Sequence, residues 1–181
     1  IQDIQVLCPA NIGGIGARSL NIELQKVLNP AAGENVERFG ITFAIGDKVM
    51  QVQNNYDKEV FNGDVGFVKT ISLEDKELII TFDDRDVSYE FDELDEVVLA
   101  YACTIHKSQG SEYTAVVIPI MMQHFMMLQR NLIYTGVTRG KKLVILVGQK
   151  KALATAVKSK KQNKRRYSKL KEWLTSPPPV P

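Results

Sequence analysis

The chain shows two successive patterns of hydrophobic and polar positions. An apolar run at residues 4–8 predicts a strand, and Leu20, Leu24, Val27 and Leu28, spaced three and four apart, predict an amphipathic helix over Arg18–Leu28, which Asn29-Pro30 ends. After residue 45 the pattern changes to short segments of alternating polarity separated by turn residues. These segments predict antiparallel strands at Lys48–Gln53, Gly66–Ser72, Glu77–Phe82 and Val87–Phe91.

Beyond residue 96 the apolar runs become continuous, which is typical of strands buried on both faces of a parallel sheet. The expected strands are Val97–Ala102, Ala115–Ile120 and Leu143–Val147, with helices at His124–Val137 and from Lys151 to Lys160 and on to Leu174. The predicted fold class is therefore α/β: a parallel sheet flanked by helices, interrupted by a small antiparallel β-barrel. We expect residues 1–45 and 96–181 to form one unit and residues 46–95 to form the insert.

Composition supports one packed domain with an insert. The 181 residues are 44% hydrophobic, and no apolar run approaches the roughly 18 residues that would span a bilayer. We therefore expect a soluble, cytoplasmic protein without a membrane partner. Because the chain begins at Ile1 rather than Met, we expect it to be a piece of a longer protein.

The net charge of +2 hides two charged regions of opposite sign. Residues 72–96 hold eleven acidic and two basic side chains, a balance of −9, whereas residues 150–173 hold ten basic side chains and one acidic, a balance of +9. Both regions suit a solvated surface, and the basic one could also contact phosphates. We expect the acidic surface to face away from any nucleic acid.

Two motifs concentrate the candidate chemistry. The first is Tyr101-Ala-Cys-Thr-Ile-His-Lys-Ser-Gln-Gly-Ser-Glu-Tyr113, which follows a predicted buried strand, and the second is Leu132-Ile-Tyr-Thr-Gly-Val-Thr-Arg139. The first motif places several donors at the carboxyl end of a parallel strand, where ligands of open α/β sheets bind. Such donors can hold a phosphate backbone without reading its bases. These donors are Thr104, His106, Lys107, Ser108 and Gln109.

These motifs resemble those of superfamily 1 DNA helicases, and the closest pattern is that of the RecD-like helicases, which include the alpha subunit of exodeoxyribonuclease V. Two further segments support the resemblance. Gly46–Gly66 looks like the entry to the SH3-like barrel of these helicases, and Leu7–Asn21 resembles the motif that opens their second motor domain. The implied fold is a RecA-like second motor domain of the P-loop NTPase type, without a phosphate loop of its own.

The resemblance implies roles for individual residues. It assigns Thr104 and His106, with Lys107 and Ser108 beside them, to the DNA strand. It places Gln109, Gly110 and Glu112 near the nucleotide, together with Thr138 and with Arg18, the one cation close to the glycine-rich turn. Arg139 matches the arginine finger that stabilises phosphoryl transfer; the simpler explanation is an arginine that offsets a helix dipole. Asn54, Asn55 and Tyr56 are candidate DNA contacts, or residues that build a turn.

The implied activity is that of an ATP-dependent DNA helicase in recombination or repair, moving 5′ to 3′ by family analogy. ATP with Mg²⁺ would be bound mainly by the N-terminal motor domain, which is missing from this sequence, so the chain alone should be inactive. The other expected partners are single-stranded DNA and nuclease or helicase subunits of a recombination complex. Two alternatives remain: a non-enzymatic nucleic-acid-binding module, and an accessory subunit whose motor has decayed.

Overall fold

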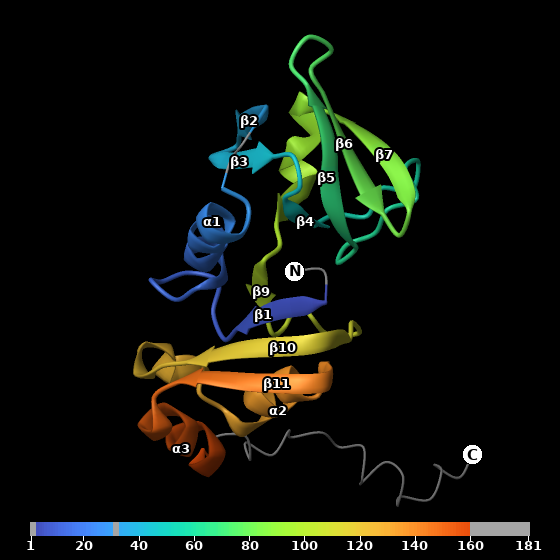
Figure 1. The fold of residues 1–181 in the computed structure, drawn as a ribbon. Helices are drawn as coiled ribbons and strands as arrows, with labels where there is room; N and C mark the ends of the chain where they lie inside the picture. The colour runs from blue at the N-terminus through green and yellow to red at the C-terminus, as the bar shows by residue number, and fades with distance from the viewer. Residues whose placement is uncertain (1–2, 31–32, 160–181) are drawn as a thin grey trace, which may run out of the picture.

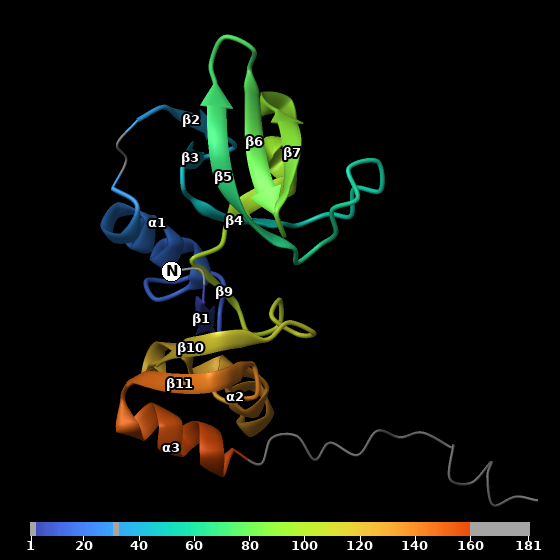
Figure 2. The ribbon, with the colours of Figure 1, turned by 45° about the vertical axis from the view of Figure 1, so that its right-hand side comes forward.

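Two β-sheets, one above the other in Figure 1, define the architecture. The computed structural model describes residues 3–30 and 33–159. Among these residues one sheet has four strands, the other has five, and a two-stranded hairpin stands apart from both. The view in Figure 2, turned by 45°, shows the same separation of the two sheets. The chain passes from the first sheet to the second and back.

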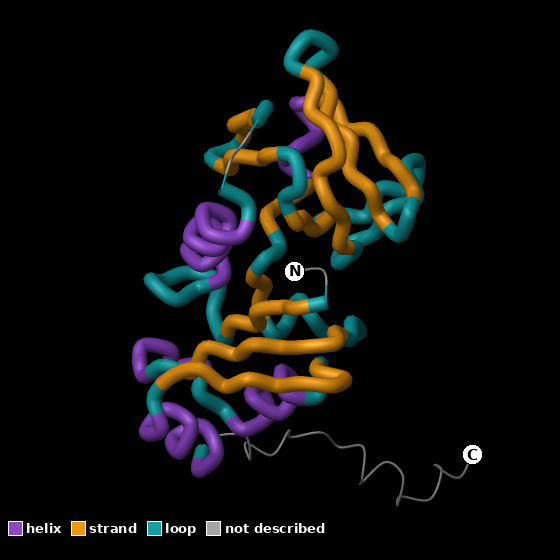
Figure 3. The backbone as a smooth tube through the Cα atoms, viewed as in Figure 1, coloured by secondary structure: helices purple, strands orange, loops and turns teal. Residues whose placement is uncertain are grey.

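All neighbouring strands of the four-stranded sheet are parallel. In sheet order they are β11 (Gly140–Gly148), β10 (Tyr113–Ile120), β1 (Ile4–Cys8) and β9 (Ala102–Thr104). The 3₁₀ helix η2 (Met122–Met127) and helices α2 (Arg130–Val137) and α3 (Lys150–Lys158) cover one face (Figure 3). Helix α1 (Ala17–Leu28) covers the other face, because Leu7 packs with α2 and α3 whereas its neighbour Cys8 packs with α1.

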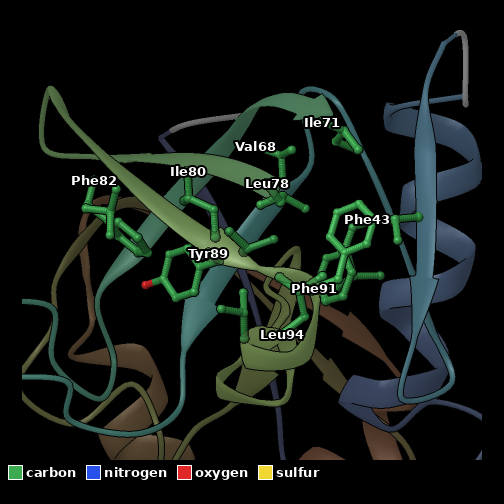
Figure 4. Packing of buried hydrophobic residues seen from close by; sticks show 14 of the residues in the cluster. Phe43, Val68, Ile71, Leu78, Ile80, Phe82, Tyr89, Phe91 and Leu94 are labelled. Atoms are coloured by element: carbon green, nitrogen blue, oxygen red, sulfur yellow. The ribbon is translucent and has the colours of Figure 1, made fainter. Parts of the chain in front are cut away.

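The five-stranded sheet is antiparallel and curls around its own core. In sheet order its strands are β7 (Arg85–Glu90), β6 (Glu77–Phe82), β5 (Val65–Ser72), β4 (Lys48–Gln51) and β8 (Val97–Leu99), with the 3₁₀ helix η1 (Phe91–Glu96) before β8. Alternate residues of β6, namely Leu78, Ile80 and Phe82, point into this core (Figure 4). The sheet therefore follows the alternation in the sequence.

The hairpin of β2 (Asn35–Arg38) and β3 (Ile41–Ala44) was not expected from the sequence. Its Val36 and Phe43 are buried in the same core as the five-stranded sheet. Figure 4 shows Phe43 in this core. The hairpin thus packs with residues of the expected insert although it precedes residue 46. The domain limits at residues 45 and 96 stay a prediction.

The predicted fold class is confirmed, whereas three expected elements need correction. The single strand expected at Val97–Ala102 is two strands in different sheets: β8 pairs antiparallel with β4, and β9 pairs parallel with β1. The helix expected at His124–Val137 is interrupted at Leu128 and Gln129, between η2 and α2. Strand β11 is not buried on both faces, because it lies at the sheet edge with Leu143 51% exposed. The expected continuation of the last helix to Leu174 lies outside the described residues.

The side chain of Asp47 links helix α1 and strand β3 to the segment that precedes β9. Its side chain is fully buried and accepts four hydrogen bonds, so its charge is compensated without a cation. The donors are the Gln25 amide, the Asn29 amide at 2.7 Å, the Ala44 backbone at 2.7 Å and the Tyr101 hydroxyl at 2.8 Å. Burial, reinforced by the neighbouring Asp47 carboxylate, raises the pKa of Tyr101, so this hydroxyl stays protonated as a donor.

Further buried polar side chains hold the segment where the chain returns to the parallel sheet. The Asn21 amide donates to the Ala102 carbonyl at 2.7 Å and accepts from the Ala102 backbone N–H at 2.8 Å, which fixes β9 on α1. Gln5 donates to the Ala100 carbonyl at 3.0 Å, and Lys48 donates to the Ile4 carbonyl at 3.0 Å. These side-chain bonds add to the backbone bonds at the crossing, from Ala100 N–H to the Lys48 carbonyl at 2.8 Å and from Val6 N–H to the Tyr101 carbonyl at 3.3 Å.

Substitution of Asp47 by Asn should destabilise the chain by about 2–4 kcal/mol, because one carboxylate oxygen is replaced by a donor that faces other donors. Urea denaturation of the wild type and the variant measures this difference. Asp57→Asn, in an exposed loop, is the matched control and should change the free energy of unfolding by less than about 0.5 kcal/mol. Equal destabilisation by the two variants would contradict the central role of Asp47.

The buried amine of Lys48 should make stability depend on pH. Burial lowers the pKa of Lys48 to about 8, whereas the unfolded chain keeps a value of about 10.4. Between these pH values the unfolded chain binds a proton that the folded chain has released, so stability rises with pH. We expect the wild type to gain roughly 2–3 kcal/mol relative to Lys48→Met between pH 7.5 and 10.5. Parallel stability curves from urea titrations would show that the folded protein leaves Lys48 charged.

Candidate functional site

The first motif connects opposite ends of the parallel sheet. Thr104 ends β9 at the carboxyl edge, level with Cys8 of β1, and Tyr113 begins β10 at the amino edge. Between them the chain turns back across the face covered by α2, where Ile105 is fully buried. Thr104 and the turn after it therefore lie near one edge of the sheet, whereas Glu112 and Arg139, which directly precede β10 and β11, lie near the other.

The carboxyl-edge turn exposes two candidate DNA contacts and buries a third. His106 and Lys107 are exposed, and the Thr104 hydroxyl accepts the Lys107 backbone N–H at 3.3 Å, which leaves its own proton free to donate. Ser108 is fully buried, and its hydroxyl donates to the Ile105 carbonyl at 2.8 Å. Within the described chain Ser108 thus shapes the turn, while Thr104, His106 and Lys107 face outward.

Arg139 lies at the amino edge, directly after α2. Its Nε donates to the Thr135 carbonyl at 3.2 Å, one terminal nitrogen donates to the Ser111 carbonyl at 3.2 Å, and the other donates to the Thr138 hydroxyl at 3.3 Å. These partners are neutral, and in residues 3–30 and 33–159 no carboxylate forms an ion pair with Arg139. The bond to Thr135 also satisfies a carbonyl at the end of α2, as expected of an arginine that only offsets the helix dipole.

The other candidate nucleotide residues lie along the segment that Arg139 contacts. Gly110 has φ +93°, a left-handed conformation that favours glycine, and a Cβ there would meet nothing within 4 Å. Glycine is therefore favoured at this position by the backbone conformation and not by a lack of space for a side chain. Gln109 is exposed, and Glu112 pairs with Lys141 at 3.1 Å on the surface. The structure therefore brings Arg139 and Thr138 to Ser111, which lies between Gly110 and Glu112.

Arg18 lies apart from this group. It stands at the start of α1 and lines a cavity of about 450 Å³ together with Asn11, Thr104 and Lys107. The structure thus groups Arg18 with residues predicted for DNA rather than with Arg139. Its predicted nucleotide role stays a prediction.

The loop that carries Asn54, Asn55 and Tyr56 is built by its own side chains. The side-chain amide oxygen of Asn54 accepts a hydrogen bond from the Asn62 backbone N–H at 2.9 Å, and that of Asn55 accepts one from the Lys58 backbone N–H at 3.1 Å. Tyr56 is 74% exposed and meets Phe61 edge to face, with ring centroids 5.9 Å apart. The two asparagines therefore build the turn, and Tyr56 is the member of the group that stays available to a ligand.

A second cavity, of about 380 Å³, adds residues that the motifs did not indicate. It lies beside the carboxyl-edge turn and is lined by His106, Gln109, Met127, Gln129, Asn131, Leu132 and Thr135. Gln129 precedes α2, Asn131 and Thr135 lie one turn apart on that helix, and all three line the cavity with His106 and Gln109. The contact depends on how α2 folds back over the sheet, so no local sequence signal could have revealed it.

No helix in the described part of the chain is long and apolar enough to cross a membrane. No group of three or more His, Cys, Asp or Glu side chains there could hold a metal ion.

Comparison with known proteins agrees with the geometry. Residues 20–82 match the SH3 domain of ATP-dependent RecD-like DNA helicases, and residues 99–147 match the UvrD-like helicase C-terminal domain. The chain is 35% identical over 176 residues to the ATP-dependent RecD2 DNA helicase of Deinococcus radiodurans, which covers 94% of this chain and 23% of that protein. It is 29% identical to the RecBCD enzyme subunit RecD of Mycolicibacterium smegmatis, covering 87% of this chain and 27% of that subunit.

Solved structures of Pif1 helicases share the fold. The Bacteroides enzyme in complex with ADP-AlF3 and single-stranded DNA superimposes with a TM-score of 0.58 and 18% identity over 80% of this chain and 40% of that chain. The Candida albicans enzyme gives a TM-score of 0.53 and 17% identity over 84% and 48%.

The parallel sheet with its helices and motifs matches a UvrD-like helicase C-terminal domain, and the antiparallel barrel matches the SH3 domain of RecD-like DNA helicases. Within that class the resemblance to the RecD-like helicases is confirmed: the chain carries their SH3 domain and a UvrD-like helicase C-terminal domain. It spans about a quarter of the length of the curated relatives described above.

Ser108→Ala should lower the free energy of unfolding by about 1 kcal/mol, because it removes a buried hydrogen bond to the Ile105 carbonyl. Ser19→Ala is the matched control, since the Ser19 hydroxyl also donates to a turn carbonyl, that of Gly13, but at an exposed site where water can replace it. Its effect should stay within about 0.5 kcal/mol. Thermal or urea denaturation compares the two, and an unchanged stability of Ser108→Ala would leave its hydroxyl free for a ligand.

Proposed function

We propose that the chain is the C-terminal part of an ATP-dependent DNA helicase, and that Arg139 is the arginine finger that completes an ATP site held by a second motor domain. The observation that carries this proposal is the state of Arg139: a guanidinium held in place by neutral partners and paired with no carboxylate in the described chain. Such a group keeps its full charge for a phosphate.

The residues at the amino edge fit one side of a bound nucleotide. Arg139 offers planar donors, and the exposed Gln109 and the open backbone of Gly110, in the segment that leads to this edge, can approach a phosphate closely. The described residues provide no carboxylate cluster for Mg²⁺, so the metal and most of the triphosphate would be bound by the N-terminal motor domain of the same protein. ATP with Mg²⁺ supplies a transferable phosphoryl group, and Arg139 would offset the charge that develops on its oxygens.

Single-stranded DNA is the proposed second ligand, at the carboxyl edge. Thr104, His106 and Lys107 face outward there and can bind the phosphate backbone without reading sequence, as a translocating motor requires. The Bacteroides Pif1 helicase of the same fold was solved with single-stranded DNA, which supports this ligand class. We extend the proposal to 5′ to 3′ movement, to recombination or repair in the bacterial cytoplasm, and to association with nuclease or helicase subunits, as the RecD relatives suggest.

The test is ATP hydrolysis by the full-length protein that carries this chain, with and without single-stranded DNA. Arg139→Ala should reduce the DNA-stimulated rate at saturating ATP by about 10³- to 10⁵-fold while ATP binding persists. Arg139→Lys should recover little of this rate, because lysine lacks the planar fork.

Arg130→Ala is the matched control, since Arg130 begins the same helix but donates to the Val157 carbonyl of α3. It should leave the rate within a few fold. Equal rates in the wild type and Arg139→Ala would remove Arg139 from catalysis. Absence of hydrolysis in the wild type, with DNA binding retained, would favour a nucleic-acid-binding module.

A further inference from the structure

The tip of the β2–β3 hairpin carries an exposed aromatic residue in an unfavourable backbone conformation. Arg38 pairs with Ile41, so the turn consists of Phe39 and Gly40 alone, with φ of +52° and +72°. Two-residue turns with positive φ at both positions prefer Asn-Gly, and a bulky residue at the first position is uncommon. The Phe39 side chain is nevertheless 60% exposed, so burial does not compensate for this conformation. Strain of this kind gathers at ligand-binding sites.

The hairpin holds Phe39 on a rigid base. Val36 and Phe43 are buried in the core of the five-stranded sheet, and the Arg38 guanidinium lies 5.3 Å from the centre of the Phe91 ring. The Gln25 amide of α1 donates to the Thr42 carbonyl at 2.9 Å. Phe39 is thus fixed relative to both α1 and the barrel, which lowers the entropy lost when a ligand binds it.

Phe39 stands over the 450 Å³ cavity that also contains Arg18 and Lys107. The cavity runs between α1, the hairpin and the β8–β9 segment, and its volume falls in the range of roughly 300–1,000 Å³ that is usual for small-molecule sites. Ile22, Ile41 and Leu99 contribute apolar walls. Among the described residues that line it, two are basic and none is acidic.

The polar side chains at one end of the cavity are free to bind a ligand. Within residues 3–30 and 33–159, the side chains of Asn11, Arg18 and Lys107 form no hydrogen bond or ion pair. The Asn21 side chain is already hydrogen-bonded to Ala102, and the Gln25 side chain to Thr42 and Asp47. An apolar slot with an aromatic face and two free cations at its end matches one nucleotide of a single strand, a flat base joined to a phosphate.

We propose that this cavity receives an unstacked base of single-stranded DNA, which stacks on Phe39 while Lys107 and Arg18 hold the adjacent phosphates. The inference rests on the proposed function and deepens it, because it adds a base-stacking site to the phosphate contacts of the carboxyl-edge turn. An apolar side chain of another protein domain would also fit the slot, but it would leave both cations without a partner. The strand would run from the turn at Thr104 along α1 towards the hairpin.

The test compares DNA affinities of the full-length protein for a 12-nucleotide strand and for copies with a single abasic position. In the wild type, abasic substitution at one position, or at two neighbouring positions, should weaken binding by about 5- to 150-fold, from a stacking contribution of roughly 1–3 kcal/mol per base. Phe39→Asn should bind the intact strand weaker by the same factor and lose its sensitivity to that abasic position. Phe39→Trp should keep both properties.

Phe39→Asn separates binding from folding, because asparagine is favoured at this turn position and should raise the melting temperature while it lowers the affinity. Lys107→Ala should weaken binding of every strand alike and make it less dependent on salt. If Lys107→Ala weakens binding but Phe39→Asn does not, the stacking site is wrong and the proposed function stands. If Phe39→Asn weakens binding without any position-specific abasic effect, Phe39 contacts protein, which also overturns the inference. If the wild type binds no DNA, the proposed function is wrong, and the base-stacking site is wrong with it.

Discussion

The buried carboxylate of Asp47 is the interaction on which the arrangement of the two sheets depends. A charge removed from water is tolerable only when donors surround it, and the four donors of Asp47 come from α1, from the end of that helix, from β3 and from Tyr101 between β8 and β9. These elements can satisfy it only in one relative placement. The carboxylate therefore fixes the barrel, the hairpin and β9 on α1, and with them the position of the motif that begins at Thr104.

The fixed position of β9 explains how one short motif serves two edges of the sheet. Asn21 aligns β9 on α1, so Thr104 emerges beside the hairpin and the cavity under Phe39. Ile105 then enters the core beneath the sheet, and the chain reaches the amino edge at Glu112. A longer connection could have been an independent loop, but this one is held at its centre by a fully buried side chain.

Elements with a local signal could be predicted from the sequence, and those that depend on distant partners could not. Strand β6 was predicted to the residue because its side chains alternate between core and solvent. The change of sheet at Ala100 and Tyr101 was hidden in one apolar run, because it is set by Asp47 and Gln5, which lie far away in the sequence. The β2–β3 hairpin could not be predicted, because Phe39-Gly40 is not a usual pair of residues for a two-residue turn. The motifs named the candidate residues, but only the fold separates Arg18 from Arg139.

Close packing between the first motif and α2 constrains how the proposed motor could work. A Cβ at Gly136 of α2 would lie 3.0 Å from Ile118 and 3.2 Å from Ile105, so the helix rests directly on the sheet and on the centre of the motif. Interiors packed this closely move as rigid units. Thr104, at the proposed DNA site, and Arg139, at the end of α2, would therefore move together. A change driven by ATP would then have to occur between this chain and the domain that binds the triphosphate, as in hinge closure, rather than within the chain.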